Sequence, residues 1–268
     1  STYKVKAELV SESGEVVDVK LSKDFNSKQE ALEFATKLLS ADLSVASIEK
    51  KPSKRSPKAP FITSTLQQEA SQKLGFSVKQ TMTIAQNLYR EGSITYMRTD
   101  SFTLSETAIE AAGKVIEQEF GAQYHHVRRF KTKDSGAQEA HEAIRPTDLT
   151  KPSIYGVDEQ TAKLYSLIYK RTLASQMSDA QLQKTQIKVN VSNADEQFLA
   201  NGEILTFPGF LKVYDYLSAD DKLLPDLSEG DALTLAGFSA RESFSRAKPR
   251  YTEASLVKKI EEMGIGRS

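Results

Sequence analysis

A nine-residue segment in the first half of the chain contains side chains suited to phosphodiester chemistry. The sequence SITYMRTDS at residues 93–101 predicts a short strand over Ile94–Arg98, in which side chains two positions apart share a face. Tyr96 and Arg98 then point the same way, and Asp100 joins them if the strand continues. A phenol with a pKa of about 10 is a weak nucleophile, and a nearby guanidinium favours the phenolate and grips a phosphate. The spacing favours attack on a phosphodiester by Tyr96.

A second segment combines a histidine, a carboxylate and an arginine. In EAHEAIRPT at residues 139–147, His141 and Arg145 are four apart, so one helical face presents both, and Pro146 predicts that the helix stops there. Such a pair can hold a phosphate or move a proton. The fifth residue of the motif is Arg145 instead of a second histidine, which excludes a zinc-protease site.

Each segment also has a reading without chemistry. The chain contains ten tyrosines, and most tyrosines pack against neighbours with the hydroxyl in water. His141, Glu142 and Arg145 are equally compatible with a surface ion-pair cluster at a helix end.

Two further segments are basic or glycine-rich. Residues 50–60, KKPSKRSPKAP, hold five basic residues, three prolines and no acid, which predicts a solvated linker, with phosphate contact as the alternative. In Gly264–Arg267, the glycines allow close backbone approach and Arg267 suits a DNA backbone contact, although a glycine also commonly ends a helix.

The surrounding pattern alternates between strands and helices. Alternating apolar residues predict strands over 3–10, 15–21, 187–191, 211–216 and 231–237. Cap residues predict helix starts at Ser27, Ser64, Ser77, Ser105 and Asp158, and a last helix is expected over 253–263. Because strands flank a helical block on both sides, the sequence predicts an α+β fold in which a discontinuous β-rich domain is interrupted by a mainly helical insertion.

Composition excludes several classes of protein. Thirty-six basic residues balance thirty-six acidic ones, so net charge alone indicates no partner. Because there is no cysteine, disulfides and thiolate zinc sites are ruled out. Only three histidines are present, which argues against a metal site built from histidines. No apolar run is long enough to span a membrane and no secretory leader is visible, which predicts a cytoplasmic protein. The chain opens with Ser1 and stops at Ser268, so we interpret it as part of a longer protein.

Four motifs occur together and in order. They are Pro60–Gln68 (PFITSTLQQ), Ile94–Ser101 (ITYMRTDS), His141–Pro146 (HEAIRP), and Tyr251–Val257 (YTEASLV) continuing to Gly264–Arg267 (GIGR). This set resembles the type IA DNA topoisomerases, in particular their bacterial topoisomerase I branch, from about residue 60 to the end of the chain.

The resemblance implies a role for each candidate residue. Tyr96 corresponds to the nucleophile that attacks single-stranded DNA and becomes linked to its 5′ phosphate. Arg98 corresponds to a phosphate-positioning arginine, His141 to a histidine supporting the same site, and Asp100 to an acid in the surrounding hydrogen-bond network. We expect Arg98, Arg145 and Arg267 to contact DNA.

The resemblance also implies a domain plan. Residues 1–61 and 184–250 would form a β-rich arch, 62–183 a helical domain carrying Tyr96, and 251–268 the start of a DNA-binding segment, with hinges near 58–62 and 180–185. It implies Mg²⁺ held by an acidic toprim domain outside this chain. The chain alone is therefore expected to be inactive, to bind single-stranded DNA weakly, to hold no metal and to be a monomer. The full enzyme would relax negative supercoils without ATP in the bacterial nucleoid.

Two other functions fit the same residues. One is a non-catalytic nucleic-acid-binding module that uses only the basic segments, and the other is a purely structural arch. Replacing Tyr96 with phenylalanine separates the first of these from an enzyme, because only an enzyme loses its reaction while keeping DNA binding.

Overall fold

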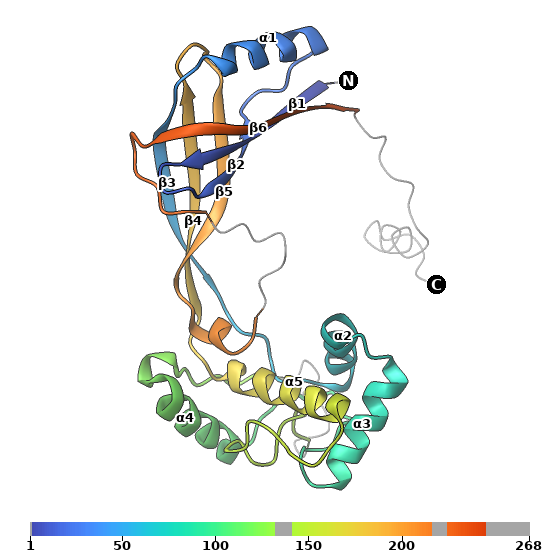
Figure 1. The fold of residues 1–268 in the computed structure, drawn as a ribbon. Helices are drawn as coiled ribbons and strands as arrows, with labels where there is room; N and C mark the ends of the chain where they lie inside the picture. Colours follow the sequence, from blue (N-terminus) through green and yellow to red (C-terminus); the bar gives the residue numbers. More distant parts are fainter. Residues whose placement is uncertain (1, 132–140, 216–223, 245–268) are drawn as a thin grey trace, which may run out of the picture. The chain divides into compact units, whose positions relative to one another are not determined.

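The computed structural model describes residues 2–131, 141–215 and 224–244, which form two compact units. Described residues of Ser1–Glu49, Gln186–Asn201 and Pro225–Ser268 make up the first unit, and those of Lys50–Thr185 and Gly202–Leu224 make up the second. The helix expected over 253–263 and Arg267 lie outside the described residues. The predicted α+β class is confirmed, since helices and antiparallel strands are both present (Figure 1).

The first unit is built around a closed barrel with strand order β1-β2-β5-β4-β3-β6. The strands are β1 (Thr2–Ser11), β2 (Val16–Leu21), β3 (Leu43–Arg55), β4 (Ala180–Val191), β5 (Gln197–Phe207) and β6 (Ala232–Ser243). β1 pairs antiparallel with both β2 and β6, and its pairing with β6 shifts register between Glu8 and Leu9. Every second residue is buried in β2 and, from Val5 on, in β1, as their alternation predicted.

One helix covers part of the barrel core with an aromatic side chain. α1 (Lys28–Leu39) begins at Ser27, whose hydroxyl accepts a hydrogen bond from the Glu30 N–H at 3.2 Å. Its Phe34 ring lies 5.5 Å from Phe25 and 5.9 Å from Phe198. Leu39, the last residue of the helix, is 81% exposed, whereas the preceding Leu38 is buried.

The second unit is mainly helical. Its helices are α2 (Thr63–Leu74), α3 (Val78–Arg90), α4 (Glu106–Phe120) and α5 (Glu159–Ser175), with 3₁₀ turns η1 (Ala122–Tyr124) and η2 (Gly209–Lys212). The predicted caps Ser77, Ser105 and Asp158 each accept a hydrogen bond from the backbone N–H three residues on. α5 is buried along most of its length and forms much of the core.

The predicted cap at Ser64 is wrong. α2 begins one residue earlier, at Thr63, and its N-cap position is Ile62. The Ile62 N–H donates to the Thr65 hydroxyl at 3.0 Å, so a side chain of the first turn bonds back to the N-cap backbone, while the N-cap residue itself supplies no side-chain cap.

Two further expectations are corrected. The segment 50–60 was predicted to be a linker, but β3 continues through Arg55, where the side chain pairs with Glu203 on β5, and Lys54 pairs with Asp179 at 3.5 Å. Acidic groups from distant parts of the chain thus pair with these two of the five basic side chains of this segment. The strand predicted over 211–216 is also wrong, because the 3₁₀ turn η2 occupies Gly209–Lys212.

A buried carboxylate fixes the position of α2. Glu69 on α2 accepts a hydrogen bond from the Tyr214 hydroxyl at 3.0 Å and lies 3.7 Å from the Arg171 guanidinium of α5 and 3.6 Å from the Lys58 ammonium. Arg171 also donates through Nε to the Ala59 carbonyl at 2.6 Å. Because Glu69, Arg171 and Tyr214 are largely removed from water, losing one of them would take a partner away from the others, and their contacts hold α2 and α5 together.

We predict that Gly209→Ala destabilises the protein far more than Gly75→Ala. Both glycines have left-handed φ angles, +52° and +69°, so each alanine costs about 1–2 kcal/mol of backbone strain. A Cβ at Gly209 would also lie 2.4 Å from the carbonyl oxygens of Ser178 and Asp179, whereas nothing lies within 4 Å at Gly75. Thermal unfolding followed by circular dichroism measures both; equal losses would contradict the packing at Gly209.

Candidate active site

Tyr96 lies in an irregular connection between α3 and α4, and the strand predicted over Ile94–Arg98 is wrong. Only Ile94 makes a strand-like contact, a single bridge to Pro146. The backbone groups of this connection bond to side chains and to separate segments instead of a neighbouring strand. Tyr96 and Arg98 therefore do not share a strand face.

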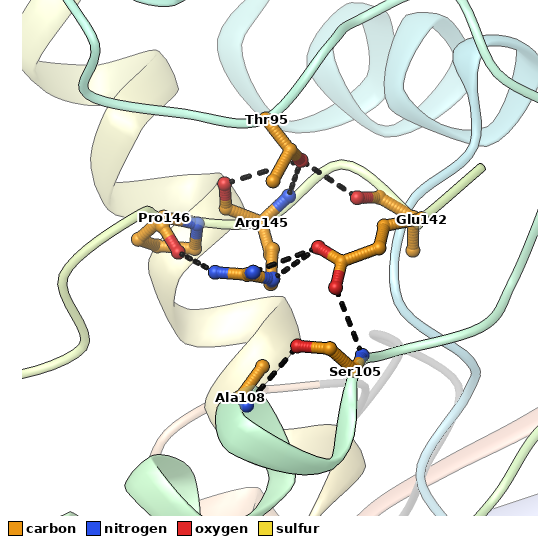
Figure 2. A network of polar contacts seen from close by, with 7 residues as sticks. Thr95, Ser105, Ala108, Glu142, Arg145 and Pro146 are labelled. Carbon is orange, nitrogen blue, oxygen red and sulfur yellow. Dashed lines mark hydrogen bonds and ion pairs between the residues drawn. The ribbon is translucent and has the colours of Figure 1, made fainter. Parts of the chain in front are cut away.

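Thr95 fixes the backbone on the N-terminal side of Tyr96. Its hydroxyl donates to the Ala143 carbonyl at 2.7 Å and accepts from the Arg145 N–H at 2.9 Å, and its own N–H donates to the Arg145 carbonyl at 2.9 Å (Figure 2). These bonds tie the tyrosine-bearing connection to residues 143–145, which belong to the second motif found in the sequence.

Thr63, the first residue of α2, fixes the backbone on the C-terminal side. Its hydroxyl donates to the Met97 carbonyl at 2.8 Å and accepts from the Thr99 N–H at 2.9 Å, while its own N–H donates to the Thr99 carbonyl at 3.0 Å. Ile94 and Met97, which are 1% and 3% exposed, add apolar anchors on both sides of the tyrosine. The backbone at Tyr96 is therefore held from both sides.

The Tyr96 side chain is open to solvent, at 44% exposed. Within the described residues its hydroxyl has no hydrogen-bond partner, and its ring lies 5.1 Å from that of Tyr89 with an interplanar angle of 65°. Two other tyrosines show the opposite arrangement. Tyr165 and Tyr169 donate to the carbonyls of Lys151 and Leu149, and burial raises the pKa of Tyr165 to about 12 and also raises that of Tyr169. Tyr96 is thus far more accessible to a phosphate than these structural phenols.

Arg98, Asp100 and His141 are all exposed, and none makes a hydrogen bond or ion pair with another described residue. The helix expected to end before Pro146 is absent at His141–Arg145. The Ala143 N–H donates instead to the Thr103 carbonyl and the Ile144 N–H to the Phe61 carbonyl, both at 2.8 Å. These bonds between segments replace helical ones, so the predicted shared helical face of His141 and Arg145 does not form.

Glu142 and Arg145 form a compact network that the sequence did not predict in this form (Figure 2). The Arg145 Nε lies 2.7 Å from the Glu142 carboxylate, and Nη1 donates to the Pro146 carbonyl at 3.0 Å. The other Glu142 oxygen accepts from the Ser105 N–H at 3.1 Å, at the residue that caps α4. The network links the 142–146 segment to the start of α4.

This network shifts the titration of Glu142. Burial opposes ionisation, but hydrogen bonds from Arg145 and Ser105, together with the charge of Arg145, outweigh it and hold the pKa of Glu142 below its ordinary 4.5. Because the Arg145 guanidinium is already engaged by Glu142 and Pro146, its predicted contact with DNA stays a prediction.

The described residues contain no group of three or more His, Cys, Asp or Glu side chains placed to hold a metal ion. Sequence reasoning also missed Thr63 and Thr95 as positioning residues, although both lie inside the recognised motifs. Threonine at these positions gives no local sign of a partner 36 or 50 residues away.

The fold defines the class of protein. It matches the full-length topoisomerase I of Thermotoga maritima with a TM-score of 0.70 and 34% identity, over 99% of this chain and 44% of that one. The mixture of helices and antiparallel strands is that of a type IA topoisomerase.

The sequence comparisons agree with the fold. The profile of the DNA topoisomerase family matches residues 2–268, and the chain belongs to that family. It is 47% identical to DNA topoisomerase 1 of Streptomyces coelicolor over 87% of this chain and 44% identical to that of Rickettsia felis over 94%. It spans 26% and 35% of those two relatives. In the described ranges, no helix combines the length and apolar character that a membrane crossing requires.

We predict that Glu142→Gln lowers stability at neutral pH and that the difference disappears in acid. The lost charge-assisted hydrogen bonds should cost about 1–3 kcal/mol. Because the folded pKa of Glu142 is depressed, its contribution is complete above about pH 4.5, the ordinary value, and is lost as the pH falls through the folded pKa.

Urea unfolding of both proteins between about pH 7 and 3 measures this gap. Glu110→Gln, at an exposed position of α4 without an ion pair to any described residue, is the matched control and should change stability much less. A gap for Glu142→Gln that is constant down to pH 3 would contradict the assigned network.

Proposed function

We propose that Tyr96 is the nucleophile of a type IA DNA topoisomerase reaction on single-stranded DNA. The observation that carries the proposal is a phenol 44% exposed on a backbone held by Thr63 and Thr95, in a chain of the DNA topoisomerase family. A fixed backbone with an accessible side chain reduces the entropy lost when a phosphate and the hydroxyl are brought together for reaction.

The proposed step is a transesterification. The Tyr96 oxygen attacks the phosphorus, an O–P bond to tyrosine forms, and the bond between phosphorus and the 3′ oxygen breaks. The phenol gives up its proton and the departing 3′ oxygen takes one up, which leaves a 5′-phosphotyrosyl link and a free 3′ hydroxyl. The hydroxyl can reverse the step after another strand has passed. Since phosphoester bonds are exchanged and none is lost, relaxation of negative supercoils needs no ATP.

Roles for the neighbouring groups are part of the proposal. Arg98 would position the phosphate and stabilise the charge developing on it, while Asp100 and His141 would support the hydrogen-bond network and proton movement around it. All three side chains are exposed and have no partner among the described residues, so they are available to contact a bound phosphate. Arg145 and Arg267 are proposed as further DNA contacts.

The proposal for the whole protein extends beyond this chain, which spans about a quarter to a third of the relatives cited. The segments 1–61 and 184–250 would form the arch that lets a Tyr96-carrying domain at 62–183 swing away from the toprim domain, with 251–268 beginning a DNA-binding segment and hinges near 58–62 and 180–185. Mg²⁺ would be bound by a toprim domain outside the chain, so the chain alone would be an inactive monomer. A bacterial cytoplasmic location, at the nucleoid, follows from the same proposal.

Tyr96→Phe tests the nucleophile directly. In a full-length enzyme carrying this segment, the variant should lose supercoil relaxation and the covalent DNA adduct, because only the attacking oxygen is removed. Binding of a single-stranded oligonucleotide should be retained. Gel electrophoresis of supercoiled plasmid and denaturing detection of the adduct provide the measurement.

Tyr155→Phe is the matched control, since Tyr155 is 91% exposed in the same unit, and it should relax DNA like the parent. A Tyr96→Phe enzyme that still relaxes DNA would refute the assignment. Parallel loss of binding would favour a non-catalytic nucleic-acid-binding role instead.

A further inference from the structure

Tyr89 is the aromatic neighbour of the proposed nucleophile. It lies in the last turn of α3, and its ring meets that of Tyr96 edge to face, with centroids 5.1 Å apart. Both side chains are 44% exposed, so each ring contacts the other and also faces solvent. Two adjoining aromatic rings that remain exposed to solvent form an apolar surface, and such surfaces often mark binding sites.

Tyr89 is firmly attached to the connection that carries Tyr96. Its carbonyl accepts a hydrogen bond from the Gly92 N–H at 3.0 Å, and the carbonyl of the preceding Leu88 accepts from the Ser93 N–H at 2.9 Å. Leu88 itself is fully buried. The end of α3 and the start of the Tyr96 segment are therefore one hydrogen-bonded structure, and the two rings keep their relative places without help from a bound ligand.

Two cations are close to the pair in the sequence. Arg90 follows Tyr89 directly and Arg98 follows Tyr96 by two positions; both are exposed, and neither makes an ion pair with another residue in the described part of the chain. Aromatic rings beside unpaired cations have the composition of a surface for single-stranded nucleic acid. Bases stack on the rings, and the cations neutralise the phosphates.

We propose that Tyr89 is a base-stacking residue that also positions Tyr96. Its ring stacks on a base of the bound single strand near the phosphate that Tyr96 attacks, and its contact with Tyr96 limits the rotation of the nucleophile. This inference rests on the proposed function of Tyr96. Stacking on Tyr89 would help to set the position of the bound DNA strand, because a base at the stacking position contributes to binding and an abasic site there does not.

The test uses a full-length enzyme carrying this segment, in a Tyr96→Phe background so that binding is measured without cleavage. Fluorescence anisotropy with a labelled single-stranded oligonucleotide compares Tyr89 with Tyr89→Phe and Tyr89→Ala. Loss of one base-stacking contact should weaken binding about five- to 150-fold in Tyr89→Ala. Tyr89→Phe keeps the ring and should stay close to the parent, as should the exposed control Tyr155→Ala. Thermal unfolding checks that all variants fold.

An abasic scan makes the test specific. Single abasic sites are placed along the oligonucleotide, and one position should weaken binding by the parent yet have no further effect on Tyr89→Ala. In the Tyr96 enzyme, Tyr89→Ala should also slow adduct formation on DNA at saturating concentration, as expected for a positioning residue. If Tyr89→Ala binds like Tyr89→Phe, or if both show the same abasic profile, the proposal is overturned.

The two proposals fail separately. Adduct formation by Tyr96→Phe would refute the nucleophile. An inert Tyr96→Phe enzyme whose binding ignores Tyr89 would refute only the stacking role.

Discussion

The structure around Tyr96 depends on satisfying backbone polar groups that have no strand or helix partner. Residues 93–103 form neither element, so their N–H and C=O groups must find partners elsewhere. Thr63 and Thr95 supply many of these bonds, each with its hydroxyl and its own N–H. Because its backbone is held in this way, this irregular segment can keep an exposed phenol in a fixed position.

The rest of the second unit holds those partners in turn. Thr63 is the first residue of α2, and α2 is fixed through Glu69 to Arg171 of α5 and to Tyr214. On the other side of the connection, the Glu142 carboxylate joins Arg145 to the capped start of α4. A charged group removed from water is destabilising without its partner, so these networks favour the arrangement of the helices in which the partners meet.

The same unit uses tyrosine in two chemically different ways. Tyr165 and Tyr169 are buried, their hydroxyls donate to carbonyl oxygens, and burial disfavours their ionised forms. Tyr96 contributes no hydrogen bond to the described structure and keeps its oxygen available. Burial confines Tyr165 and Tyr169 to packing, whereas the exposed Tyr96 oxygen is available for the proposed nucleophilic role.

The sequence by itself determined the elements whose signals are local, and the motif set that identified the family. Caps at Ser77, Ser105 and Asp158 act within three residues, and the alternation of β1 and β2 repeats every two, so both could be predicted. Tertiary structure alone decided that residues 94–98 are not a strand and residues 141–145 not a helix. Their backbone groups bond to partners 34 to 83 residues away, as between Met97 and Thr63 or Ile144 and Phe61, and no local pattern records a bond at that separation.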